Sequence, residues 1–134
     1  MRTRRHCSSA QKPTYPTPRL AWRRGSRSGA SLRTGGLQRV LVTLGAHGSV
    51  VLDSLARGAE DQITRIAPPT RVSAVDTTGA GDAFTGAVAA RLAAGESLAG
   101  AASFASVAAA LAATKKGTQA AYPTIADVEQ LRDA

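Results

Sequence analysis

The chain has 134 residues, which is enough for one domain with a single hydrophobic core and too few for two domains of ordinary size. Its formal net charge of +8 comes from one end, because residues 1–36 hold nine of the 17 Lys and Arg residues and no acidic residue. Residues 37–134 are nearly neutral, so we do not expect them to bind nucleic acid. No apolar run is long enough to cross a membrane, no signal-peptide pattern occurs, and the one cysteine, Cys7, cannot form an internal disulfide. We therefore expect a cytoplasmic protein.

Residues 1–36 are rich in Arg, Ser, Thr, Pro and Gly and show almost no apolar periodicity. Such a segment cannot bury enough apolar surface to offset its ordering entropy, so the sequence predicts a disordered leader. The leader could be a transit peptide or an arm for nucleic acid, since it is Arg-rich and free of acids. It could also be a solvated tail, or a stretch translated from a wrong start or a shifted frame. The lack of a basic amphipathic repeat favours these last alternatives.

Short apolar runs separated by glycine begin at Val40. Residues 40–44 are continuously apolar or β-branched, which predicts a strand buried on both faces of a sheet. Pro68 ends a weaker run, because proline cannot donate to a strand ladder. We predict a turn at residues 45–48 and further strands at residues 49–52, 62–66 and 72–75.

Helical patterns follow. The first is Ala-rich, runs over residues 83–94 and ends at Gly95, which suits a left-handed cap. The second runs over residues 97–114 from the N-cap residue Ser97, and its inward face is expected to consist of Leu98, Ala101, Ala105, Ala108, Leu111 and Ala112. The last begins at Thr124 with a capping-box-like pattern. The fold class is therefore α/β, with an incomplete sheet covered by helices.

The loop between the last predicted strand and the first helix carries the most specific chemical signal. Gly79 and Gly81 let a ligand approach backbone N–H groups at a helix N-terminus, where the helix dipole favours a phosphate. Asp82 stands beside them and could accept a proton from an attacking hydroxyl. Alternatively, the glycines only form a turn and Asp82 only caps a helix. The spacing excludes a P-loop and a dinucleotide-binding fingerprint.

Three segments, in order, resemble the ribokinase or PfkB-type carbohydrate kinases. Residues 76–84, DTTGAGDAF, are similar to the C-terminal signature of that family, and residues 42–48 resemble its nucleotide loop. Residues 114–123 are similar to the segment after the second helix. The resemblance implies that residues 37–134 are the C-terminal part of a ribokinase-like, Rossmann-like layered domain.

The resemblance also implies roles for individual residues. Asp82 would be the catalytic base toward the sugar hydroxyl, with Gly79, Ala80 and Gly81 forming the anion hole. The ATP site would be formed by Thr43, Leu44, Gly45, Ala46, His47 and Gly48, together with Gly81, Asp82 and the neighbourhood of Ser106. A monovalent cation such as K⁺ would lie among Asp76, Thr78, Ala112, Lys115 and Gly117. The family uses ATP with Mg²⁺, acts on ribose or a related small sugar, and is often homodimeric.

The chain departs from the family in three ways. Nothing in residues 1–36 resembles the sugar-binding segments, and a chain without asparagine cannot contain the family's N-x-x-E motif, which helps to place Mg²⁺. Ala121 replaces a hydroxyl ligand of the cation. Lys115 and Lys116 could contact nucleotide phosphates or could be a solvated helix end. We therefore expect part of an ATP-dependent sugar kinase that is inactive alone. The alternative is a non-catalytic remnant with at most weak nucleotide binding.

Overall fold

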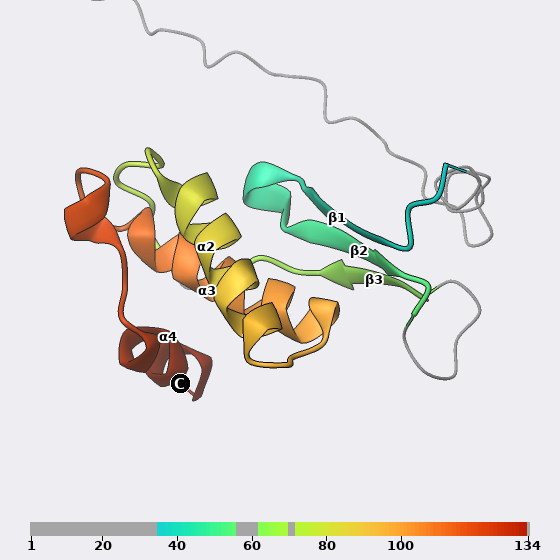
Figure 1. Ribbon diagram of the computed structural model, residues 1–134. Coiled ribbons are helices and arrows are strands. Elements are labelled where there is room, and N and C mark those ends of the chain that lie inside the picture. The colour runs from blue at the N-terminus through green and yellow to red at the C-terminus, as the bar shows by residue number, and fades with distance from the viewer. Residues whose placement is uncertain (1–34, 56–61, 70–71, 134) are drawn as a thin grey trace, which may run out of the picture.

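A three-stranded antiparallel sheet forms one layer of the computed structural model, which describes residues 35–55, 62–69 and 72–133 (Figure 1). Most of the predicted leader lies outside these residues. The strands are β1 (Arg39–Thr43), β2 (Ser49–Asp53) and β3 (Gln62–Ile66), in the order β1-β2-β3. Three of the four predicted strands are therefore confirmed.

The hairpin between β1 and β2 is closed by a short 3₁₀ turn, Gly45–His47, in the place predicted for a turn. The Leu44 N–H donates to the carbonyl oxygen of Gly48 at 2.8 Å. Gly48 has a φ of 87°, and a Cβ atom there would collide with the carbonyl oxygen of Ile66 on β3. Only glycine fits this position without a backbone shift.

The predicted fourth strand, residues 72–75, is not formed. The N–H groups of Val75 and Asp76 both donate to the carbonyl oxygen of Ala113, at 2.8 and 3.1 Å, so the segment is tied to the end of a helix rather than to the sheet. Val75 is 61% exposed. A short β-branched run becomes a strand only where an edge is available to pair with it, and the sequence pattern does not contain that information.

The prediction that the first strand is buried on both faces also fails. The side chains of β1 are exposed or only half-buried, whereas all five residues of the central strand β2 are buried. The apolar character of β1 is therefore not matched by its environment in this structure.

Three helices, α2 (Ala80–Ala93), α3 (Leu98–Ala112) and α4 (Ile125–Asp133), complete the described part. The helix α2 begins earlier than predicted because Gly79, with a φ of 79°, is its N-cap. Its predicted end is confirmed by the left-handed Gly95. The Oγ atom of Ser97 accepts from the Gly100 N–H at 3.1 Å and caps α3. None of the helices in residues 35–55, 62–69 and 72–133 is long and apolar enough to cross a bilayer.

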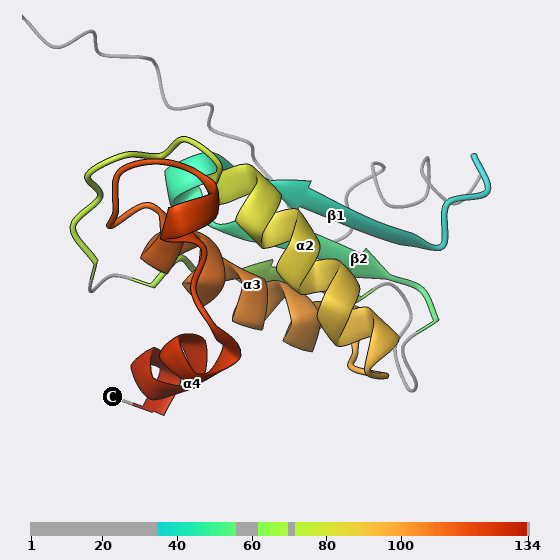
Figure 2. The same ribbon diagram turned by 60° about the vertical axis from the view of Figure 1, so that its left-hand side comes forward.

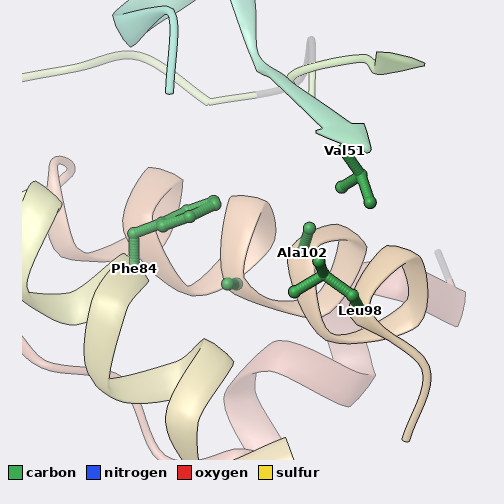
Figure 3. Close-up of a cluster of buried hydrophobic side chains, with 5 residues drawn as sticks. Val51, Phe84, Leu98 and Ala102 are labelled. Carbon is green, nitrogen blue, oxygen red and sulfur yellow. The ribbon is translucent and has the colours of Figure 1, made fainter. Parts of the chain in front are cut away.

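The helices α2 and α3 pack on one face of the sheet, giving two layers (Figures 1 and 2). The core between the layers contains Val51, Phe84, Leu98, Ala102 and Ala105, most of which are labelled in Figure 3. The small alanines of α3 allow this helix to lie close to all three strands. The predicted inward face is confirmed, with Leu98, Ala101, Ala105, Ala108 and Ala112 buried and Leu111 half-buried.

Candidate functional site

The loop that enters α2 leaves backbone donors free at the helix N-terminus. The Ala80 N–H, which was predicted as part of the anion hole, donates instead to the carbonyl oxygen of Thr77 at 3.2 Å. The Ala83 N–H donates to the carbonyl oxygen of Gly79 at 2.9 Å. In the part of the chain that the structure describes, the N–H groups of Gly79, Gly81 and Asp82 have no acceptor. An anion placed at the N-terminus of α2 could therefore receive hydrogen bonds from them and benefit from the helix dipole.

The same end of α2 is open to solvent. Gly81 and Asp82 are exposed, and a Cβ atom built on Gly81 would meet no heavy atom within 4 Å. The Asp82 carboxylate lies in the first turn of the helix and has no ion-pair partner in the described residues. A ligand can therefore reach both the free donors and the carboxylate without rearrangement of the loop.

Asp76 joins this loop to the segment that follows α3. Its Oδ1 atom accepts from the Thr78 N–H at 2.9 Å, and its Oδ2 atom accepts from the Gly117 N–H at 3.2 Å. The hydroxyl of Thr78, followed by the N–H groups of Thr78 and Gly117, lowers the pKa of Asp76 below its ordinary value. Two segments that are 41 residues apart in sequence are thus held together by one carboxylate.

Thr118 packs against the glycine that caps α2. A Cβ atom on Gly79 would lie 3.3 Å from Cγ2 of Thr118, so the two backbones approach closely. The carbonyl oxygen of Ala113 accepts from Val75 and Asp76 in the same region. Sequence reasoning did not find Ala113 or Thr118 as supports of this loop, since any residue has a carbonyl group and nothing local marks the contact.

The residues predicted around a monovalent cation therefore lie on adjoining segments. Asp76 and Thr78 precede α2, while Ala112, Lys115 and Gly117 end α3 or follow it. One carboxylate with backbone carbonyl oxygens is a ligand set that suits a hard cation. Ala121 is buried but offers no hydroxyl. Within residues 35–55, 62–69 and 72–133, no group of three or more His, Cys, Asp or Glu side chains is placed to hold a metal.

The predicted nucleotide loop, Thr43–Gly48, lies at the same end of the molecule. In both ribbon views the turn at residues 45–47 is beside the N-terminal end of α2 (Figures 1 and 2). Residues 45–47 are exposed. Ser106 is buried, and its hydroxyl donates to the carbonyl oxygen of Ala102 at 3.0 Å, so that hydroxyl is engaged within α3.

Residues 26–125 match the sequence model of a protein family that is described as "pfkB family carbohydrate kinase". The chain belongs to the pfkB family of carbohydrate kinases. The matched range begins at residue 26, upstream of the boundary predicted at residues 36 and 37, and contains the 76–82 loop, the nucleotide loop and the segment after α3.

Individual pfkB proteins are similar to this chain over most of its length. A deoxyribokinase of Salmonella typhi is 39% identical over 95 residues, which are 71% of this chain and 29% of the deoxyribokinase. The structure of Arabidopsis thaliana ribokinase complexed with ribose and ATP is similar with a TM-score of 0.60 and 36% identity, covering 76% of this chain and 31% of the ribokinase.

Phosphofructokinase-2 of Escherichia coli in complex with potassium gives a TM-score of 0.63 at 28% identity, covering 78% of this chain and 31% of that protein. The chain therefore spans less than a third of the length of each of these three proteins. The predicted ribokinase-like fold class is confirmed for the part that they share.

Proposed function

We propose that this chain is the nucleotide-binding and catalytic part of an ATP-dependent sugar kinase, which transfers the γ-phosphate to a hydroxyl of ribose or a related sugar. The observation that carries the proposal is the N-terminus of α2, where free N–H groups of Gly79, Gly81 and Asp82 adjoin an exposed carboxylate. The ribose and ATP in the Arabidopsis ribokinase structure support both substrates.

In this reaction the sugar hydroxyl oxygen attacks the γ-phosphorus, and the bond to the oxygen between the β- and γ-phosphates breaks, which releases ADP. One carboxylate oxygen of Asp82 accepts the hydroxyl proton. The N–H groups of Gly79, Gly81 and Asp82 donate to the phosphoryl oxygens as charge develops on them. The turn at residues 45–48 contributes to the nucleotide site.

Two cations fit this arrangement. Mg²⁺ bound by ATP would neutralise charge on the β- and γ-phosphates. A monovalent cation such as K⁺ would be held by Asp76 and by carbonyl oxygens of Thr78, Ala112, Lys115 and Gly117, and would fix the loop that carries the free donors. The potassium in the phosphofructokinase-2 structure supports this choice of ion.

We expect the sugar-binding site to lie outside the described residues. The family resemblance places sugar-binding residues in the N-terminal half of these kinases, whereas this chain spans 29% of the Salmonella deoxyribokinase. Phosphoryl transfer requires the hydroxyl to be held in line with the γ-phosphate. The chain alone is therefore expected to bind ATP and not to phosphorylate sugar.

Two separate measurements test this function. Calorimetric titration with ATP should show binding to the purified chain, and a coupled ADP-release assay with ribose, deoxyribose and hexoses should show no sugar-dependent turnover. When the chain is fused to the N-terminal part of the Arabidopsis ribokinase, sugar-dependent ADP release should appear. In that fusion, Asp82→Asn should lower turnover by about 10²–10⁴-fold, with ATP affinity changed by no more than about threefold, because the loop keeps its shape.

Each result has a contrary outcome. Sugar-dependent turnover by the chain alone would show that it contains an acceptor site. Near-normal turnover of the Asp82→Asn fusion would show that Asp82 is not the catalytic base. If the fusion with Asp82 unchanged binds ATP but shows no sugar-dependent turnover, the alternative, a non-catalytic remnant, is favoured.

A further inference from the structure

The side chain of Thr118 lies against the loop that carries the free N–H groups. A Cβ atom built on Gly79 would lie 3.3, 3.4 and 3.5 Å from Cγ2, Cβ and Cα of Thr118. The segment that contains Thr118 is held there by the Gly117 N–H, which donates to the Asp76 carboxylate. In both ribbon views this segment, between α3 and α4, runs beside the loop before α2 (Figures 1 and 2). The methyl side of Thr118 therefore makes a contact between parts of the chain that are far apart in sequence.

The hydroxyl of Thr118 does not cap the turn that follows it. Thr118 is the N-cap residue of the 3₁₀ turn Gln119–Ala121, a position at which the hydroxyl of threonine usually accepts a backbone hydrogen bond. Here the turn has no side-chain cap, and the Ala121 N–H donates to the carbonyl oxygen of Thr118 at 3.0 Å. The contact that distinguishes threonine from serine at this position is therefore the one between its methyl group and Gly79.

Thr118 is also not a core residue. It is exposed, and neither of the two hydrophobic clusters includes it. Substitutions at exposed positions usually change the free energy of unfolding little. The contact is therefore better explained by its effect on the loop than by a contribution to the stability of the whole chain.

Gly79 needs a contact from outside the loop to hold its conformation. Its φ of 79° is left-handed, and glycine populates positive and negative φ about equally, so the loop sequence alone does not fix this angle. Gly79 is the N-cap of α2, and its carbonyl oxygen accepts from the Ala83 N–H. A rotation at Gly79 would turn the first turn of the helix and redirect the N–H groups of Gly81 and Asp82. Thr118 fills the space beside Gly79 and so limits this rotation.

We propose that Thr118 is a positioning residue for the γ-phosphate, because its methyl group holds Gly79 in the conformation that directs the free N–H groups toward the anion. Thr118 acts through Gly79 and not by contact with the phosphate. This inference rests on the proposed function, since it takes the γ-phosphate of ATP as the anion at the N-terminus of α2. ADP lacks that phosphate, so Thr118 should matter for the preference of the chain for ATP over ADP.

Three variants separate the methyl group from the hydroxyl. Thr118→Val keeps the branched shape without the hydroxyl, Thr118→Ser keeps the hydroxyl without the methyl group, and Thr118→Ala removes both. The 134-residue chain is titrated calorimetrically with ATP and, separately, with ADP in the presence of Mg²⁺. The preference for ATP should fall by about three- to tenfold in the Ser and Ala variants, because hydrogen bonds to the γ-phosphate are misdirected. Affinity for ADP and the melting temperature should stay unchanged, and the Val variant should keep the preference.

Amide chemical shifts test the positioning without nucleotide. In the free chain, the ¹H and ¹⁵N shifts of Gly81 and Asp82 should move in Thr118→Ser and Thr118→Ala and stay in place in Thr118→Val. This measurement separates the inference from the proposed function. If the unchanged chain binds neither nucleotide, the proposed function fails, whereas the amide shifts still decide whether Thr118 positions the donors.

Three outcomes would overturn the proposal. Unmoved shifts of Gly81 and Asp82 in the Ser and Ala variants would show that Thr118 does not hold the loop. An equal loss of ATP preference in the Val and Ser variants would show that the hydroxyl matters and the methyl group does not. A fall in melting temperature together with equal losses of affinity for ATP and ADP would leave Thr118 only a structural role.

Discussion

Gly79 adopts a left-handed backbone conformation immediately before the first turn of α2, with its Cα facing Thr118. These two constraints are independent, because one concerns the local φ and the other concerns space against a neighbouring segment. The free N–H groups of Gly81 and Asp82 depend on this turn for their direction. Glycine at this position therefore supports both the loop and the anion site that the loop creates.

Gly79→Ala should destabilise the chain by about 1–3 kcal/mol, because a non-glycine residue with a positive φ is strained and the new Cβ presses on Thr118. ATP affinity should fall with it. Gly86→Ala is the control, since Gly86 lies within α2 and a Cβ there meets nothing within 4 Å. That variant should be stabilised by up to about 1 kcal/mol. Urea unfolding and ATP titration measure both effects, and an equal response of the two variants would show that Gly79 has no special role.

The Asp76 carboxylate makes stability depend on pH in acid. Its pKa is lowered below 3.8 in the folded chain by the hydroxyl and N–H of Thr78 and by the Gly117 N–H. A carboxyl with a depressed folded pKa contributes stability that is fully present above the unfolded pKa and is lost as the pH falls through the folded value. Asp76→Asn should therefore reduce the loss of thermal stability between about pH 5 and about pH 2.

Asp133→Asn is the control for that experiment, because Asp133 is an exposed carboxylate without a hydrogen bond to any described residue. Melting temperatures of both variants and the unchanged chain are compared across the pH range. If Asp76→Asn and the unchanged chain lose stability in parallel as the pH falls, the hydrogen bonds of Asp76 to Thr78 and Gly117 do not contribute to the pH dependence of stability.

At the scale of elements, α4 is the helix most dependent on its cap. It has nine residues and packs on α3 mainly through Val128, which is buried against Phe104 and Ala108. The Asp127 Oδ2 atom accepts from the N–H and hydroxyl of Thr124, at 2.8 and 2.7 Å, and the Asp127 N–H donates to the Thr124 Oγ1 atom at 3.3 Å. A short helix with few docking residues relies on such a box to begin.

Thr124→Ala should cost about 0.5–2 kcal/mol of the stability of α4, because it removes two of these hydrogen bonds. Ser103→Ala, at an exposed position on α3, serves as the control and should have little effect. The readout is amide exchange at Val128 and Leu131, which reports opening of α4 rather than of the whole chain. Unchanged exchange at these amides in Thr124→Ala would contradict the role of the cap.

Local features of the elements could be predicted from the sequence, and long-range features could not. The caps at Ser97, Gly95 and Thr124 depend on residues within a turn of each other, so their patterns were sufficient. The missing strand at residues 72–75 and the Asp76 to Gly117 hydrogen bond depend on contacts across the chain. For the site, spacing and the helix dipole predict an anion site at the glycines and Asp82, and the cation set comes only from the family resemblance. Both stay predictions.

At the scale of the whole molecule, the excess of positive charge lies in residues 1–36, most of which are outside the residues that the structure describes. The nine basic residues of the first 36 account for the pI of about 11.1, while the two-layer structure is built from the nearly neutral remainder. The core clusters and the candidate site are formed by residues after Val40. The family match begins at residue 26, inside the predicted leader of residues 1–36. The boundary between the leader and the folded part can therefore be tested by deleting residues up to 25 or up to 36.

Removal of residues 1–25 should leave the melting temperature and ATP affinity unchanged, because this segment has no apolar pattern that could add to the core and lies outside the family match. Removal of residues 1–36 tests the boundary itself. If residues 26–36 contribute to the fold, as their place in the matched range suggests, the longer deletion should lower the melting temperature while the shorter does not. If they belong to the leader, both deletions should behave alike. Binding to an unrelated duplex DNA, measured over a series of salt concentrations, should be weak, should decrease steeply with salt, and should disappear with the shorter deletion, since seven of the nine basic residues in residues 1–36 lie before residue 26. Retention of DNA binding by the chain without residues 1–36 would show that the nearly neutral part binds nucleic acid, contrary to the charge argument.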